Sequence, residues 1–203
     1  MLRLLILFTF SLSAMASFAQ GVKMRDVFAD MPDSILPLIT KNNRLDCIDF
    51  IESNVPAQVK NLVDEPIELT VLTDRYLKLT MSKVSQAEMK LLRVNDTTQV
   101  VCMVRTYAGP IEDSQIEFYD LGWKPLDMSV NEPDLEAYFP EVPQEEQARR
   151  AEVVAMLRDL PLRTAHLSAE DEMITFQVQT SELMKKDREW AEKYAKPVKV
   201  KVG

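Results

Sequence analysis

From residue 67 onward, hydrophobic and polar residues alternate in several short runs along the chain. Alternation with a period of two is typical of half-buried strands, because successive side chains point to opposite faces of a sheet. Short links join consecutive runs, which favours an antiparallel meander. The pattern predicts strands within residues 67–74, 75–82, 88–94, 99–107 and 115–123.

The run QVVCMVRTY, residues 99–107, differs from its neighbours because every residue from Val100 to Val104 is hydrophobic. A continuous hydrophobic run of this length is typical of a strand that is covered on both faces. Gly109 and Pro110 follow it and form a turn signal. We therefore expect a central strand at 99–107 that forms a hairpin with 115–123.

Before these strands, residues 21–54 show mainly helical spacing, with a break between two pieces expected at Asn42–Asn43. Leu45, Ile48 and Ile51 recur every three residues and are predicted to face the core. The acidic residues of the second piece then lie on the solvent side: Asp46, Asp49 and Glu52.

The second half of the chain mixes helical and alternating patterns. Residues 125–144 contain four prolines and several acidic residues, so we expect a linker or an irregular crossing there. The expected elements beyond it are a helix at 145–160, strands at 160–168 and 172–181, a helix at 182–195 and a last strand at 197–202.

Strands and helices thus occur in separate groups, which indicates an α+β fold. We expect N-terminal helices, an antiparallel β-meander, then helix, β-hairpin, helix and a last strand, packed as one unit. The predicted parts are a helical segment plus antiparallel sheet at 20–126, a proline- and acid-rich linker or crossing at 127–145, and a helix–hairpin–helix–strand part at 146–203.

The first nineteen residues, MLRLLILFTFSLSAMASFA, have the pattern of a signal peptide. Arg3 supplies the positive start, and Ser17 and Ala19 supply the small residues before a cleavage point ahead of Gln20. The apolar run is shorter than the roughly 20 residues that a transmembrane helix needs. We therefore expect residues 1–19 to be cleaved, and the mature protein to be periplasmic or extracellular with no membrane span.

Composition narrows the classes of function. The formal net charge is −8 and basic residues do not cluster, which argues against nucleic acid and anionic membrane surfaces as partners. The chain has four glycines, too widely spaced for a dinucleotide fingerprint, a phosphate-binding loop or a nucleophile elbow. We expect no cofactor.

The chain contains few histidine and cysteine residues, the types that commonly act in catalysis or bind transition metals. His166 is the single histidine, and a lone histidine at a strand end is more often a surface or half-buried residue than a catalytic base. Together with Cys47 and Cys102 it makes three Cys or His residues, whereas structural zinc takes four ligands. We predict no metal site and no catalytic residue.

Cys47 and Cys102 are expected to lie close together inside the fold, one on a helix and the other on the central strand. An oxidising compartment permits a disulfide between them. Two buried free thiols are also ordinary, because cysteine behaves as a small hydrophobic residue. Sequence spacing leaves both alternatives open.

Four aromatic residues gather in and after the expected hairpin: Tyr107, Phe118, Tyr119 and Trp123. Exposed as one contiguous patch, they would line a groove for a peptide or a glycan. Their alternating spacing also fits residues of the sheet core and edge.

We expect a non-catalytic binding or structural role. The alternative is a small carboxylate-dependent hydrolase acting on glycans, since glycosidases use two carboxylates, one with a raised pKa. Acidic runs on turns and outer helix faces are normally solvated instead. A further option is a partner that adds a strand at the edge formed by 197–202. The alternating lysines argue against easy pairing at this edge, though an acidic partner could use them.

Four segments carry a resemblance: MPDSILPLITKNNRLDCIDFIES, TDRYLKL, EMKLLRV and QVVCMVRTYAGPIEDSQIEFYDLGWKPL. Together they resemble an uncharacterised family of exported Bacteroidetes proteins that has only a domain-of-unknown-function label. The resemblance covers the chain from about Met24 to the last strand. It implies a Gram-negative envelope setting, and it brings no catalytic residues. We expect an unknown envelope protein or a glycan as the partner.

Overall fold

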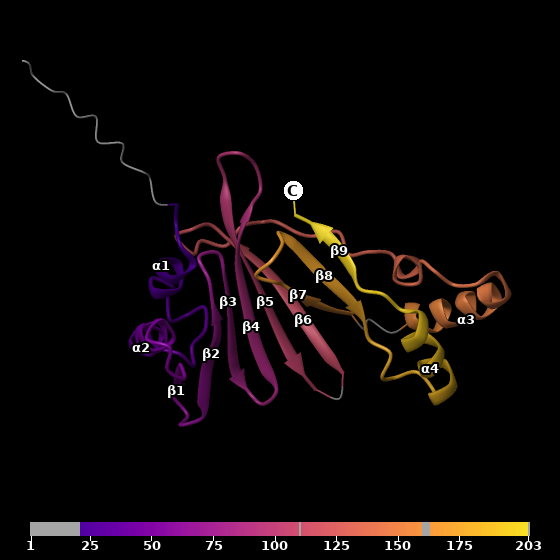
Figure 1. The fold of residues 1–203 in the computed structure, drawn as a ribbon, viewed down its shortest axis with the longest axis horizontal. Helices are drawn as coiled ribbons and strands as arrows, with labels where there is room; N and C mark the ends of the chain where they lie inside the picture. The colour runs from indigo at the N-terminus through magenta and orange to yellow at the C-terminus, as the bar shows by residue number, and fades with distance from the viewer. Residues whose placement is uncertain (1–20, 110, 160–162, 203) are drawn as a thin grey trace, which may run out of the picture.

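The computed structural model describes residues 21–109, 111–159 and 163–202, and its largest element is a six-stranded sheet (Figure 1). Its strands follow one another in chain order, and every neighbouring pair is antiparallel, as predicted. The predicted signal peptide lies outside the described residues. The strands are β1 (Gln58–Lys60), β2 (Pro66–Leu72), β3 (Tyr76–Ser82), β4 (Ser85–Arg93), β5 (Gln99–Ala108) and β6 (Glu112–Tyr119).

The second half of the chain forms a three-stranded antiparallel sheet with helices beside it (Figure 1). Within the described chain, no helix combines the length and the apolar character that crossing a membrane requires. The order of elements confirms the predicted α+β fold. They are the 3-10 helices η1 (Leu135–Tyr138) and η2 (Gln144–Glu146), then α3 (Gln147–Arg158), β7 (Arg163–His166), β8 (Met173–Val178), α4 (Lys185–Tyr194) and β9 (Val198–Lys201).

Two N-terminal helices, α1 (Met24–Ala29) and α2 (Lys41–Glu52), lie against the β1–β2 side of the six-stranded sheet (Figure 1). The hydroxyl of Thr40 accepts a hydrogen bond of 3.3 Å from the backbone N–H of Asn43, so Thr40 caps α2. The predicted break at Asn42–Asn43 is therefore wrong. Both residues lie in the first turn of α2, and the break between the helices is at residues 30–40.

Two hydrophobic cores lie on opposite faces of the six-stranded sheet, and β5 contributes to both. Val101 and Met103 belong to the first core, which includes residues of α1 and α2. Cys102 and Val104 belong to the second core, which includes residues of the C-terminal sheet. All four are fully buried, and their alternation places them on opposite faces. The expectation of a central strand covered on both faces is confirmed.

The second core contains residues from both halves of the chain. Phe118 of β6 belongs to it, as does Phe176 of β8. The stretch 127–145, expected as a linker or irregular crossing, contributes the buried residues Leu135, Tyr138 and Phe139 to this core. The second core is therefore shared by the two halves of the chain.

A charged residue, Arg44, is completely buried beside the first core. Its Nε donates to the carbonyl oxygen of Phe28 at 3.1 Å, and Nη1 donates to that of Ile39 at 2.8 Å. Nη2 donates to the carbonyl of Met31, and Nη1 also reaches the Asp33 carboxylate at 2.8 Å. One guanidinium group thereby ties the end of α1 and the 30–40 segment to α2.

The buried face of α2 differs from the predicted one. Leu45, expected in the core, is 40% exposed, while Arg44 and Ile48 are buried. The prediction for Leu45 is wrong because the irregular 30–40 segment leaves backbone carbonyls that point at α2. These carbonyls need donors, which an apolar side chain lacks.

Replacing Arg44 by alanine would leave these buried carbonyls without a donor and open a cavity. We expect the free energy of unfolding to fall by about 3–5 kcal/mol, because three backbone carbonyls lose their donor and each unsatisfied buried group costs about 1–3 kcal/mol. Chemical denaturation monitored by circular dichroism measures the change. The control is Arg25→Ala, because Arg25 forms an exposed ion pair with Glu52 and should change stability by less than about 1 kcal/mol. Equal effects of the two variants would contradict the role of Arg44.

Candidate functional site

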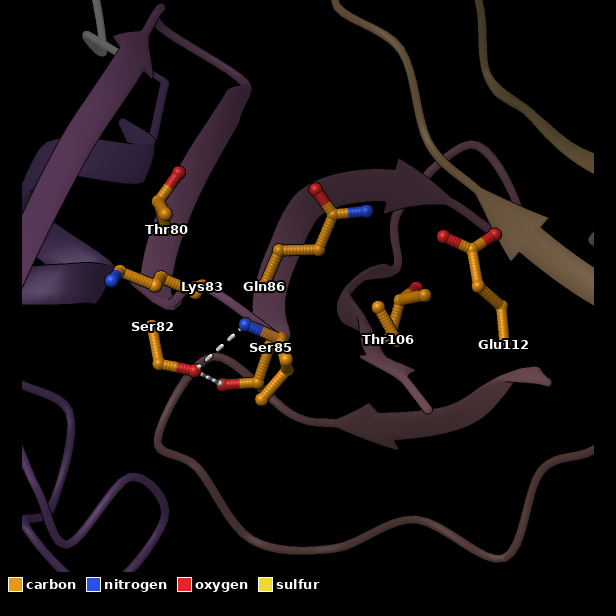
Figure 2. A pocket seen from close by; sticks show the side chains of 9 residues that line it. Thr80, Ser82, Lys83, Ser85, Gln86, Thr106 and Glu112 are labelled. Atoms are coloured by element: carbon orange, nitrogen blue, oxygen red, sulfur yellow. Dashed lines mark hydrogen bonds between the residues drawn. The ribbon is translucent and has the colours of Figure 1, made fainter. Parts of the chain in front are cut away.

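A polar hollow lies on the second-core face of the six-stranded sheet, at the end where the β3–β4 turn and the start of β6 meet (Figure 2). Its volume is about 230 Å³. Residues of four neighbouring strands and one turn form it: Thr80, Ser82, Lys83, Val84, Ser85, Gln86, Thr106, Ala108 and Glu112. We call this set the polar hollow.

The sheet register explains why these side chains gather. Thr80 pairs with Gln86, and Gln86 pairs with Thr106 on the next strand. Residues directly opposite each other in antiparallel strands point to the same face. Figure 2 shows their side chains, with that of Glu112, extending to one side of the sheet. A row of hydroxyl and amide groups thus forms the floor of the hollow.

Some of these polar groups are already engaged within the protein. Ser82 Oγ lies 3.3 Å from Ser85 Oγ, and the Thr106 hydroxyl lies 2.9 Å from that of Ser114. Glu112 accepts a hydrogen bond of 3.3 Å from the Gln179 amide.

Two groups of the floor, the side chains of Gln86 and Thr80, differ from these because they have no hydrogen-bond partner among the described residues. Thr80 and Gln86 are neighbours in the register of β3 and β4. A side-chain amide offers two donors and an acceptor, and a hydroxyl offers one donor and acceptor sites. This part of the floor can therefore bond to a ligand without breaking a protein contact.

A buried carboxylate, Glu88, lies next to the polar hollow, two residues along β4 from Gln86. Its side chain is 4% exposed. It accepts hydrogen bonds of 3.0 Å from the Tyr76 hydroxyl and from the backbone N–H of Leu167. His166 Nδ1 and Lys78 Nζ each lie 3.6 Å from its oxygens. The single histidine of the chain is therefore a partner of the buried carboxylate.

These contacts determine the ionisation of Glu88. Burial would raise the pKa of its carboxyl group, but the contact with His166, the hydrogen bonds from Leu167 and Tyr76, and the charge of Lys78 hold that pKa below its ordinary value. Burial and the negative charge of Glu88 raise the pKa of Tyr76. Glu88 is thus an ionised acceptor and Tyr76 a neutral donor at neutral pH.

A second buried charge on β4, Lys90, holds the turn between β7 and β8. Its ammonium group donates to the carbonyl of Ser168 and lies 5.8 Å from the centre of the Tyr76 ring. Arg75 and Glu172 form an ion pair of 2.6 Å nearby. Together with Glu88, these contacts tie the three-stranded sheet to the six-stranded one.

The acidic residues of α2 do not join this site. Asp46, Asp49 and Glu52 are exposed, as expected for the solvent side. Glu52 forms an ion pair of 2.8 Å with Arg25. The carboxylates that the structure places near the hollow are instead Glu112 and Glu88.

The four aromatic residues considered for a groove do not share one. Phe118 belongs to the second core, whereas Tyr119 and Trp123 belong to the first, on the other face of the sheet. The indole N–H of Trp123 donates to the carbonyl of Val27 at 2.8 Å. Tyr107 is exposed. Phe118, Tyr119 and Trp123 are therefore core residues, and the neighbours Phe118 and Tyr119 lie on opposite faces because side chains alternate along a strand.

Cys47 and Cys102 are both buried free thiols. Cys47 belongs to the first core and Cys102 to the second, so the sheet lies between them. The expectation that they lie close together is wrong, and the structure contains no disulfide between them. Burial raises the pKa of the Cys47 thiol to about 11 and also raises that of Cys102.

Glu88 and Lys90 were missed because charged residues in an alternating run are normally assigned to the solvent face. A signal was present in the sequence. In the strand EMKLLRV, strict alternation puts both residues on the same face as Leu92. In the structure Leu92 belongs to the second core.

Comparison with known proteins identifies the family. The model of the family described as "Protein of unknown function (DUF3256)" matches residues 14–201. The chain belongs to the DUF3256 family. Among curated proteins, no sequence matches it.

The fold of this DUF3256 protein is also similar to a solved structure, that of a domain of an uncharacterized protein from Porphyromonas gingivalis W83. The TM-score is 0.65 and the sequence identity 23%, over 86% of this chain and 90% of the other. At this identity the similarity concerns the fold alone.

The state of the two thiols can be measured directly. In the native protein, a thiol reagent such as dithionitrobenzoate should label both cysteines slowly, because each is buried and its thiolate is disfavoured. In denaturant without reductant, two thiols per chain should react at once. Two reactive thiols that appear only after reduction would show a disulfide and contradict the structure.

Replacing Glu88 by glutamine removes the negative charge but keeps the shape of the side chain. The Tyr76 hydroxyl and the backbone N–H of Leu167 then have at least one charged acceptor fewer. We expect the free energy of unfolding at neutral pH to fall by about 1–3 kcal/mol. Because the pKa of Glu88 is lowered in the folded protein, its contribution is complete above the ordinary glutamate value of 4.5 and is lost as the pH falls through the lower folded value.

Urea unfolding across this pH range measures the difference between the wild type and E88Q. The difference should be constant near neutral pH and shrink in acid. Glu68→Gln is the matched control, because Glu68 is exposed on β2 and should change stability by about 0.5 kcal/mol or less. A difference that grows in acid would contradict the assignment.

Proposed function

We propose that this protein is an exported, non-catalytic binding protein of the bacterial envelope that takes a neutral polar ligand, a glycan, in the polar hollow. One observation carries the proposal. The amide of Gln86 and the hydroxyl of Thr80 line the hollow from adjacent strands without another protein partner among the described residues. Sugar hydroxyl groups are both donors and acceptors, as these two side chains are.

The setting of the hollow suits recognition by hydrogen bonds. Its floor is a sheet buried on its other face, since Ala87 between Gln86 and Glu88 belongs to the first core. Groups held on such a scaffold lose little conformational entropy when they bind a ligand. A volume of about 230 Å³ is below the usual range for whole drug-sized ligands. We therefore expect one unit of a longer chain to occupy it.

The hydrolase alternative receives less support. A glycosidase needs a general acid with a raised pKa beside a second carboxylate. The pKa of Glu88 is lowered instead, and both of its oxygens already contact donors of the protein. Export rests on the signal-peptide pattern at 1–19 and remains part of the proposal.

The test is titration of isotope-labelled mature protein with a panel of neutral oligosaccharides: chitotetraose, maltotetraose and cellotetraose. We expect at least one of them to shift the side-chain amide signal of Gln86 in NMR spectra. Gln86→Ala should weaken that binding roughly tenfold, which corresponds to the loss of about one net hydrogen bond.

Gln115→Ala is the matched control, because Gln115 is an exposed glutamine on β6 at a position that alternation assigns to the other face. It should leave the affinity unchanged. The proposal fails if no oligosaccharide of the panel shifts residues of the hollow, or if the two variants weaken binding equally.

A further inference from the structure

The strand β9 lies at an edge of the three-stranded sheet, at the outside of the molecule (Figure 1). It pairs with β8 from Met173–Lys201 to Phe176–Val198. No described strand pairs with its other side. An antiparallel edge strand directs half of its N–H and C=O groups outward, where another strand can pair with them.

The two faces of β9 differ in chemistry. Val198 and Val200 pack against the second core but are only partly buried. Lys199 and Lys201 are exposed on the opposite face. A strand added at this edge would therefore extend the core on one face and meet lysine side chains on the other.

The charge of this edge contrasts with that of the chain, whose formal net charge is −8. Lys199 forms an ion pair with Asp171. Lys201 has no ion-pair partner among the described residues, so one positive charge at this edge is available to an acidic residue of a partner. Cross-strand pairs of opposite charge stabilise an antiparallel pair, and like charges destabilise it.

We propose that the edge of β9 binds an extended segment of a partner protein in which acidic residues alternate with apolar ones. The acidic side chains pair with the lysine face, and the apolar ones continue the row of Val198 and Val200. Main-chain hydrogen bonds supply the rest of the interaction, as in other cases of strand addition. This interaction is separate from ligand binding in the polar hollow.

The same pattern argues against a second copy of this chain as the occupant. If two β9 strands paired antiparallel with their faces matched, lysine would lie opposite lysine at every exposed position. Such like-charged pairs are unfavourable, so the edge favours an acidic strand over self-association.

The probe is a capped peptide of alternating Glu and Val, added to isotope-labelled mature protein. We expect slower hydrogen exchange of the outward amides of β9, with chemical-shift changes confined to 198–202 and the strand beside it. Lys201→Glu should weaken binding roughly fivefold, since one attractive pair becomes repulsive. A peptide of alternating Lys and Val should bind K201E more tightly than it binds the wild type.

Two controls separate strand addition from general attraction of charges. Lys60→Glu reverses a lysine on β1, the edge strand of the other sheet, and should leave the affinity unchanged. A Glu–Val peptide with N-methylated backbone amides keeps its charge but cannot pair with the edge, and should not bind. Circular dichroism shows whether each variant is folded.

Three results would overturn the proposal. The first is equal binding of the N-methylated peptide, and the second is the absence of exchange protection in β9 at millimolar peptide. The third is a dimer in solution with β9 amides protected before any peptide is added, which would assign the edge to a second copy.

Discussion

The six-stranded sheet is covered on both of its faces at β5, and the remainder of the structure depends on this constraint. Alternate residues of one strand enter two different cores, Val101 and Met103 on one side, Cys102 and Val104 on the other. The N-terminal helices complete the first core and the C-terminal elements complete the second. Neither half of the chain can bury the hydrophobic surface of this strand alone.

The second face of the sheet also contains charged groups, which is unusual because burying a charge is costly unless it is paired. Glu88 and Lys90 satisfy this condition through the turn after β7: Leu167 donates to Glu88, and Ser168 accepts from Lys90. Such contacts need specific geometry, so they favour one placement of the three-stranded sheet. This placement leaves the adjacent row, with Thr80 and Gln86, lining the polar hollow.

Membership of the DUF3256 family and the similarity to the Porphyromonas gingivalis domain place the chain in a family and a fold. The function proposed for it depends on the site. The polar hollow has neutral hydrogen-bonding groups on its floor, and the one carboxylate buried beside it is held ionised by its partners. This arrangement favours recognition of a ligand over proton transfer.

The sequence by itself determined the elements that local periodicity encodes. Alternation in 67–123 predicted the meander, and the uninterrupted run from Val100 to Val104 predicted a strand covered on both faces, because side-chain direction in a strand follows from its period of two.

Only the tertiary structure decided which residues meet. Arg44 is buried because backbone carbonyls of another segment need a donor. Cys47 and Cys102 lie on opposite sides of the six-stranded sheet. His166 of the three-stranded sheet contacts Glu88 of the six-stranded sheet. These contacts connect residues far apart in the chain, and local periodicity carries no information about the register in which such segments pack.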